Sequence, residues 1–154
     1  MTKVEITEVA ASSFYKSEAF GPQNLIDGNK NFGGWITDIA AWQNAWIEFR
    51  FAEPVSLFSL EICNGFIEEE VANTRDDYYF HKRAKNMVIH LGGDHPKLLH
   101  EILEDIKEPQ ILTLGIFQPI QTVRIIFTSV YDSVPDSSIT PYDVLGLRHV
   151  EWRS

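Results

Sequence analysis

A short loop at residues 27–29 has residue types that could hold a cation. It reads Asp27-Gly28-Asn29 and follows the apolar pair Leu25-Ile26. Asp and Asn side chains hydrogen-bond the backbone beside them and Gly accepts a positive φ, so the triplet favours a tight turn. Such a loop turns oxygen atoms inward, and oxygen atoms are the ligands that calcium prefers. The loop therefore predicts either a structural calcium ion at Asp27 and Asn29, or a metal-free turn in which Asp27 caps backbone amides.

A second set of residues could recognise a carbohydrate. Sugar recognition needs a flat apolar face for the ring and convergent polar groups for its hydroxyls. Side chains of both kinds occur in the long stretches that separate the expected strands. The predicted stacking residues are Trp42, Tyr79 and Tyr131, and the predicted hydrogen-bonding residues are Asn64, Lys82 and Arg83. The same basic pair would also suit a carboxylate or phosphate, because arginine binds such groups with two parallel hydrogen bonds.

These residues also have purely structural interpretations. Asn64 could satisfy backbone groups at a strand end, and Lys82 and Arg83 could belong to an ordinary solvated loop. Trp35 and Trp46 are more typical of side chains that fill the core of a sandwich. The acidic residues at 68–70 and 76–77 favour a solvated loop over a cation site.

The sequence lacks the arrangements that most enzymes use. It has no Gly-x-Ser-x-Gly motif and no Gly-rich phosphate loop, and its five histidines do not have the spacing of a metal-binding motif. The single cysteine, Cys63, lies within an expected strand, which favours a buried thiol over a nucleophile. We therefore predict a non-catalytic protein.

The elements that must position these residues are short strands. Runs of alternating or continuous apolar residues, bounded by turn residues, predict eight strands at 4–10, 46–51, 57–64, 86–91, 98–103, 110–114, 122–130 and 147–152. A hairpin turn is expected at 92–94 and a short helical turn at 22–26, where Pro22 suits a first helical position. Three long loops, at 12–43, 65–85 and 131–146, contain most of the candidate site residues. This pattern predicts an all-β fold, an eight-stranded antiparallel jelly-roll β-sandwich.

Composition narrows the possible partners. A chain of 154 residues is expected to form one domain, residues 1–154, with a core large enough to need no disulfide. The net charge of −9 argues against nucleic acid and against an anionic membrane surface. The sequence contains neither a membrane-spanning apolar stretch nor the apolar run of a signal peptide, which predicts a cytoplasmic location by default. Neutral sugars and basic protein surfaces remain as expected ligands.

Motifs in a fixed order along nearly the whole chain resemble the galactose-binding-like β-sandwich superfamily. This superfamily includes discoidin domains, coagulation-factor C-type domains and family 32 carbohydrate-binding modules. Within it, the chain looks most like the glycan-binding domain associated with bacterial NAD-glycohydrolases. The residues that carry the resemblance are Ala11-Ser12-Ser13, 22–29 (PQNLIDGN), Trp35, 46–51 (WIEFRF), 62–66 (ICNGF), Tyr79, 82–85 (KRAK), 124–131 (RIIFTSVY) and 147–152 (LRHVEW).

The resemblance implies a recognition module that binds carbohydrate through loops at one end of a sandwich. It also implies a calcium site that joins Asp27 to a carboxylate of the last strand. That carboxylate position falls on His149, while Glu151 lies two residues further along and points to the same face. Glu151 is therefore the predicted third metal ligand. The alternative function is an intracellular protein–protein adaptor, because the same sandwich also occurs in adaptors of DNA repair and of intraflagellar transport.

Overall fold

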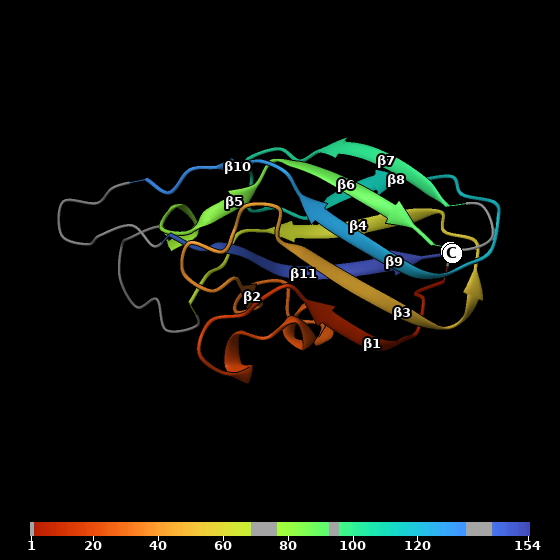
Figure 1. The fold of residues 1–154 in the computed structure, drawn as a ribbon, viewed down its shortest axis with the longest axis horizontal. Helices are drawn as coiled ribbons and strands as arrows, with labels where there is room; N and C mark the ends of the chain where they lie inside the picture. Colours follow the sequence, from red (N-terminus) through yellow and green to blue (C-terminus); the bar gives the residue numbers. More distant parts are fainter. Residues whose placement is uncertain (1, 69–76, 93–95, 135–142) are drawn as a thin grey trace.

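The computed structural model describes residues 2–68, 77–92, 96–134 and 143–154, and it shows two β-sheets packed face to face (Figure 1). One sheet has the order β1-β3-β9-β6-β7, and all its pairings are antiparallel. Its strands are β1 (Ile6–Ala11), β3 (Trp46–Val55), β6 (Asn86–Leu91), β7 (Lys97–Ile102) and β9 (Ile120–Phe127).

The other sheet contains six strands, in the order β10-β5-β11-β4-β8 with β2 paired to β11. Its strands are β2 (Trp35–Ile36), β4 (Ser59–Asn64), β5 (Lys82–Ala84), β8 (Gln110–Thr113), β10 (Val130–Tyr131) and β11 (Leu145–Arg153). The long strand β11 pairs with β4 over most of its length and with β5 in parallel at its start. Figure 1 shows β5 and β10 at the end of the sandwich opposite the C-terminus.

The core lies between the two sheets, and the alternation of each strand determines what it contributes. In β3, Ile47, Phe49 and Phe51 are fully buried, whereas the intervening Arg50 is exposed. Leu60 of β4 and Trp152 of β11 face them from the other sheet and belong to the same apolar cluster. The largest side chains enclosed there are Trp35 and Trp152, so Trp35 fills the core as its structural interpretation predicted.

The predicted fold class is confirmed, and each of the eight predicted strands corresponds to a strand of the structure. The helical turn is also confirmed as the 3₁₀ turn η2 (Pro22–Ile26), with Pro22 in its first turn. The prediction missed three short strands. β2 and β5 lie within loops expected from the sequence, and β10 lies where the predicted strand 122–130 meets the predicted loop 131–146. It was also wrong that every pairing is antiparallel, since β5 and β11 run in parallel. Most of the expected hairpin turn at 92–94 lies outside the described residues.

Among the described residues, no helix is long and apolar enough to span a membrane.

Candidate functional site

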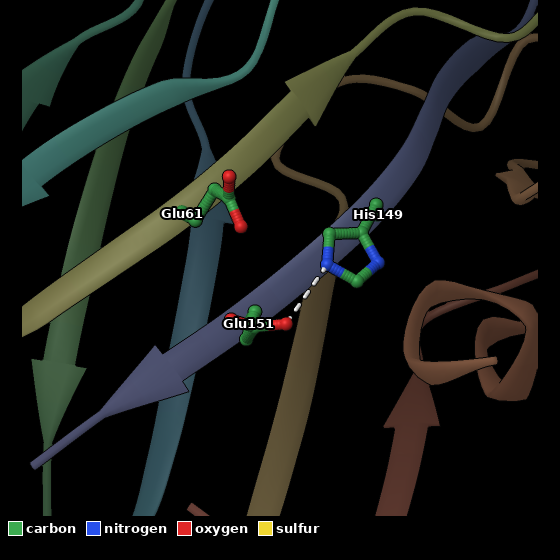
Figure 2. A group of neighbouring side chains, drawn as sticks. All are labelled: Glu61, His149 and Glu151. Carbon is green, nitrogen blue, oxygen red and sulfur yellow. Dashed lines mark ion pairs between the residues drawn. The ribbon is translucent and has the colours of Figure 1, made fainter. Parts of the chain in front are cut away.

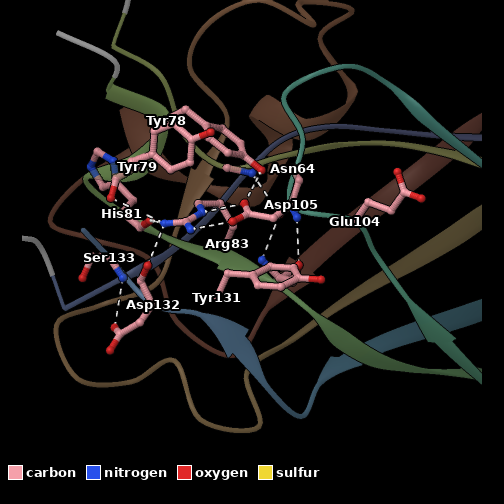
Figure 3. A network of polar contacts seen from close by, with 12 residues as sticks. Asn64, Tyr78, Tyr79, His81, Arg83, Glu104, Asp105, Tyr131, Asp132 and Ser133 are labelled. Carbon is pink, nitrogen blue, oxygen red and sulfur yellow. Dashed lines mark hydrogen bonds and ion pairs between the residues drawn. The ribbon is translucent and has the colours of Figure 1, made fainter.

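Arg83 of β5 lies at the centre of a polar network at this loop-rich end of the sandwich (Figure 3). Only 2% of the residue is exposed. Its Nε and Nη2 atoms donate hydrogen bonds to the two carboxylate oxygens of Asp105, at 3.0 and 2.9 Å. Its Nη1 atom donates to the carbonyl oxygens of His81 and Asp132, at 3.1 and 2.8 Å. The arginine thereby ties together three segments that are far apart in the sequence.

Two tyrosines of the 3₁₀ turn η3 (Asp77–Tyr79) pack against this guanidinium. Its Cζ atom lies 5.4 Å from the ring centroid of Tyr78 and 5.1 Å from that of Tyr79, within cation–π range. The Tyr78 hydroxyl donates to Oδ1 of Asp105 at 2.9 Å. Burial is the main cause that raises the pKa of Tyr78, and this hydrogen bond raises it further. Burial would raise the pKa of Asp105 too, but hydrogen bonds from Arg83 and Tyr78 outweigh it and hold that pKa below its ordinary value.

Gly65, at the end of β4, allows this packing. It has a φ of 75°, and a Cβ atom there would lie 2.6 Å from the Tyr78 ring. A side chain at this position would be strained by its backbone and would displace the tyrosine. The Ile62-Cys63-Asn64-Gly65-Phe66 motif therefore has a structural reason for its glycine.

Around the network lies a more accessible set of side chains, Trp42, Tyr79, Asp132 and Asp143, which we call the rim. Tyr79 is 37% exposed and Trp42 is half-buried. The Trp42 Nε1 atom donates to Oδ1 of Asp143 at 2.8 Å. Lys82 donates from Nζ to Asp132, and this atom also lies 3.6 Å from Oδ1 of Asp143 and 5.1 Å from the Trp42 ring centroid. The hydrogen bond from Lys82 lowers the pKa of Asp132.

Of the six residues predicted to bind the ligand, only two belong to the rim, Trp42 and Tyr79. Lys82 and Arg83 are 8% and 2% exposed, and both are held by carboxylates. The Tyr131 hydroxyl donates to the carbonyl of Leu103 at 2.7 Å. Asp105, Asp132 and Asp143 were not predicted, although their position in loops between strands was a signal that they could pair with the predicted cations.

Asn64 has a structural role that its sequence context allowed. It is fully buried, and its Nδ2 atom donates to the carbonyl of Ala84 at 2.8 Å. Its Oδ1 atom accepts from the amides of Gly65 and Ala84, at 3.0 and 2.9 Å. This side chain joins the end of β4 to β5 and presents no surface to a ligand in this structure.

The Asp27-Gly28-Asn29 loop forms the expected tight turn. Oδ1 of Asp27 accepts the amide of Asn29 at 2.8 Å, and Gly28 has a φ of 87°. Oδ1 of Asn29 accepts the amides of Asn31 and Phe32, at 3.0 and 3.1 Å. These bonds are those of the metal-free turn, and calcium binding at this loop stays a prediction.

Glu151 lies in a different group of side chains, with Glu61 of β4 and His149 of β11 (Figure 2). Asp27 is not among them. Glu151 is already paired with Arg153, whose Nε donates to it at 2.8 Å, and with Lys3 at 3.9 Å. Glu151 therefore has a histidine, a second carboxylate and two cations as neighbours, and a calcium ion that joins Asp27 to Glu151 stays a prediction.

No protein-family model matches the sequence, and no curated protein matches it. Solved structures do match. The CBM32 domain of AlyQ, in complex with 4,5-unsaturated mannuronic acid, is 15% identical with a TM-score of 0.66, over 99% of this chain and 98% of that one. The family 32 CBM of NanJ from C. perfringens, in complex with galactose, is 15% identical with a TM-score of 0.64, over 98% and 97%. An F5/8 type C domain from Bacteroides fragilis is 16% identical with a TM-score of 0.63, over 97% and 95%.

At these identities the likeness concerns the fold and leaves the ligand open. The superposition extends over nearly the whole of this chain and of each of these domains, so the sequence resemblance to the superfamily is confirmed at the level of architecture. This chain has the β-sandwich fold of family 32 carbohydrate-binding modules and F5/8 type C domains.

Proposed function

We propose that this protein is a non-catalytic carbohydrate-recognition module that binds glycans at the rim. The observation that carries the proposal is the pairing of accessible aromatic rings with a rigid polar support. Tyr79 and Trp42 offer ring faces and edges, and Asp132 and Asp143 offer accessible oxygens. Carbohydrate binding uses this combination of stacking surface and fixed hydrogen-bonding groups.

The buried network behind the rim supports the proposal because it fixes the rim before a ligand arrives. Arg83 holds the segments of Tyr79 and Asp132 together through its cation–π contact with the former and its hydrogen bond to the carbonyl of the latter. A binding surface that is ordered in advance loses less conformational entropy when it binds. Arg83 and Asn64 therefore act as positioning residues, and the contact residues are those of the rim.

The charge of the rim favours neutral sugars. The side chains of Asp132 and Asp143 are 81% and 51% exposed, and within the described part of the chain both pair with one cation, Lys82. Arg83 is neutralised by Asp105 in the interior. An excess of one carboxylate therefore faces the solvent, and it would repel a uronic or sialic acid while accepting hydrogen bonds from hydroxyls. The protein as a whole, with a net charge of −9, adds to this repulsion.

The known domains of this fold agree with sugar binding, although they bind sugars of different charge. The NanJ domain was solved with galactose, a neutral sugar, and the AlyQ domain with an unsaturated mannuronic acid. We place this chain with the neutral-sugar binders because of its rim carboxylates. More specifically, we propose that this chain is related to the glycan-binding domain associated with bacterial NAD-glycohydrolases, which its sequence motifs resemble.

A glycan array followed by NMR or calorimetric titration of each positive sugar tests the proposal. We expect neutral glycans among the positives, with dissociation constants of about micromolar to millimolar because the contact area is small. Tyr79→Ala and Trp42→Ala should each weaken binding at least about tenfold, as expected when a stacking contact is lost. Phe117→Ala is the matched control, because Phe117 is 90% exposed and precedes the start of β9, at the opposite end of the sandwich.

Two outcomes would overturn the proposal. One is a complete array without a bound glycan. The other is a bound glycan whose affinity is unchanged by both rim variants. Either outcome would favour the protein–protein adaptor, for which a pull-down with wild-type protein and a rim variant as control is the next experiment.

A further inference from the structure

Three ionisable side chains meet on the face of β4 and β11 that points away from the core (Figure 2). Glu61 lies directly opposite Glu151 in the strand register, and His149 is two residues before Glu151 on the same face. Each offers one ligand atom, and these atoms all lie within 4.8 Å of one another. The three residues are 7%, 8% and 1% exposed in the order Glu61, Glu151 and His149.

Among the residues that the structure describes, the buried imidazole of His149 has no hydrogen-bond partner. Neither Nδ1 nor Nε2 makes a hydrogen bond with any of them, and Nε2 lies 3.5 Å from Oε1 of Glu151, which is longer than a normal hydrogen bond. Buried polar groups without partners are rare, and each one calls for an explanation such as a bound ion. The nitrogen that faces the two carboxylates is positioned to bind a metal ion between them.

The cations that surround the carboxylates leave the inward oxygen of Glu151 available. Arg153 binds Oε2 of Glu151, with Nε at 2.8 Å and Nη2 at 2.6 Å. Oε1 faces His149 and is otherwise approached only by Lys3, at 3.9 Å, among the described residues. Arg153 therefore orients the carboxylate in the way that outer groups commonly orient a metal ligand.

Glu61 is held closely by Lys30, a cation that can leave, and more loosely by Arg153. Lys30 donates from Nζ to Oε2 of Glu61 at 2.9 Å and its side chain is 38% exposed, whereas Nη2 of Arg153 lies 3.8 Å from the same oxygen. A lysine ammonium on a flexible and partly exposed chain can turn into water at little cost. Its departure would free Glu61 to provide the second ligand oxygen.

We propose that Glu61, His149 and Glu151 bind one divalent transition-metal ion, such as Zn²⁺, which takes the place of the Lys30 ammonium. One nitrogen and two carboxylate oxygens suit zinc and its neighbours, whereas calcium prefers oxygen ligands alone. The ion would link β4 to β11 across the register pair Glu61–Glu151. This site is separate from the glycan-binding rim, so either proposal can fail without the other.

Calorimetric titration of untagged protein with ZnCl₂ at pH 7.5 tests this site, with Co²⁺ absorption as a second readout. We expect one ion per chain and complete loss of binding in His149→Gln. Lys30→Met should bind the ion roughly two- to fivefold more tightly, because it lacks the competing half-exposed ion pair. This gain of affinity tests the site even where His149→Gln fails to fold.

Two matched controls identify the ligands. His100→Gln removes an exposed histidine of β7 and should bind zinc as the wild type does. Cys63→Ser removes the buried thiol opposite His149 in the register and should also keep the binding. The proposal is overturned if neither the wild type nor Lys30→Met binds zinc or cobalt, if His149→Gln binds like the wild type, or if Cys63→Ser abolishes binding.

Discussion

Replacing Arg83 by methionine should destabilise the protein more than any other single change at the loop end. Methionine keeps much of the volume but removes the charge and all the hydrogen bonds. Asp105 loses both of its arginine donors, and the carbonyls of His81 and Asp132 lose theirs. The rings of Tyr78 and Tyr79 lose the guanidinium that they pack against.

The size of the effect follows from how much water can reach the groups left behind. Breaking a buried ion pair by removing one partner costs about 3–5 kcal/mol. The Asp105 side chain is 30% exposed, so water partly replaces the arginine and the cost should be about 3 kcal/mol, at the lower end of this range. Arg83→Lys should recover no more than about half of this loss, because an ammonium cannot bind both carboxylate oxygens and both carbonyls. In a domain of this size, a loss of about 3 kcal/mol lowers the melting temperature by roughly 6–12 °C.

Urea unfolding followed by circular dichroism measures this loss at pH 7. Arg124→Met is the matched control, because Arg124 pairs with Glu48 at 3.2 Å on a half-exposed face and should cost only about 1 kcal/mol. A loss in Arg83→Met that does not exceed the loss in Arg124→Met would refute the reasoning that burial makes the network strong.

Three further predictions concern pH, calcium and a backbone contact. Hydrogen bonds hold the pKa of Asp105 below its ordinary value, so the stability that Asp105 contributes is complete above the unfolded pKa of about 3.9 and is lost as the pH falls through the folded value. In urea unfolding from pH 6 to 2, the free energy of unfolding should therefore fall less steeply in Asp105→Asn than in the wild type. Parallel declines of the two proteins would contradict this. Asp27→Ala should lower the free energy of unfolding by about 1 kcal/mol, because the amide of Asn29 loses its acceptor, and the loss should be equal in calcium and in EDTA. If calcium instead stabilises the wild type and the variant abolishes this effect, a calcium ion is bound at the loop. Gly34→Ala should cost at least about 3 kcal/mol of stability, because its Cβ would lie 2.0 Å from the carbonyl oxygen of Leu147 and its φ is 109°. Gly28→Ala should cost only about 1 kcal/mol, because its φ is 87° but its Cβ would meet no atom within 4 Å. Equal shifts of the two melting temperatures would disprove the steric argument.

Sequence periodicity predicted β3 and β9 because part of each strand is buried on one side only. Over 46–51 of β3 and 123–127 of β9, every second residue is buried, and this alternation is visible in the residue types themselves. The strands that were missed, β2, β5 and β10, have only two or three residues each, which is too few to show a period. The parallel pairing of β5 with β11 joins Lys82 to Leu145, a contact between distant segments that no local pattern encodes.

The predicted residues Asn64, Tyr79 and Arg83 lie in one polar network, but the burial of Asn64 and Arg83 was not predicted. Polar residues in a loop are expected to be exposed, yet Arg83 is buried because Asp105, from a loop between β7 and β8, neutralises it there. The loop position of Asp105 indicated that it could pair with a cation, but no local pattern indicated that this cation is Arg83. The burial of Asn64 has a similar cause, since both its groups are satisfied by the backbone of β4 and β5. Tyr79 is exposed and Trp42 and Tyr131 are half-buried, so these three are the predicted residues that the interior does not enclose.

Substitutions in the buried network and substitutions in the accessible rim should have different effects. The network residues are set by packing and by hydrogen bonds, so a change there costs stability before it alters recognition. The side chains of the rim are less constrained by packing, and two domains with this fold, each 15% identical to this chain, were solved with sugars of different charge, galactose and an unsaturated mannuronic acid. The fold therefore leaves the ligand of this chain open. Our proposal of a neutral sugar rests instead on the two accessible carboxylates that lie beside Lys82 among the described residues.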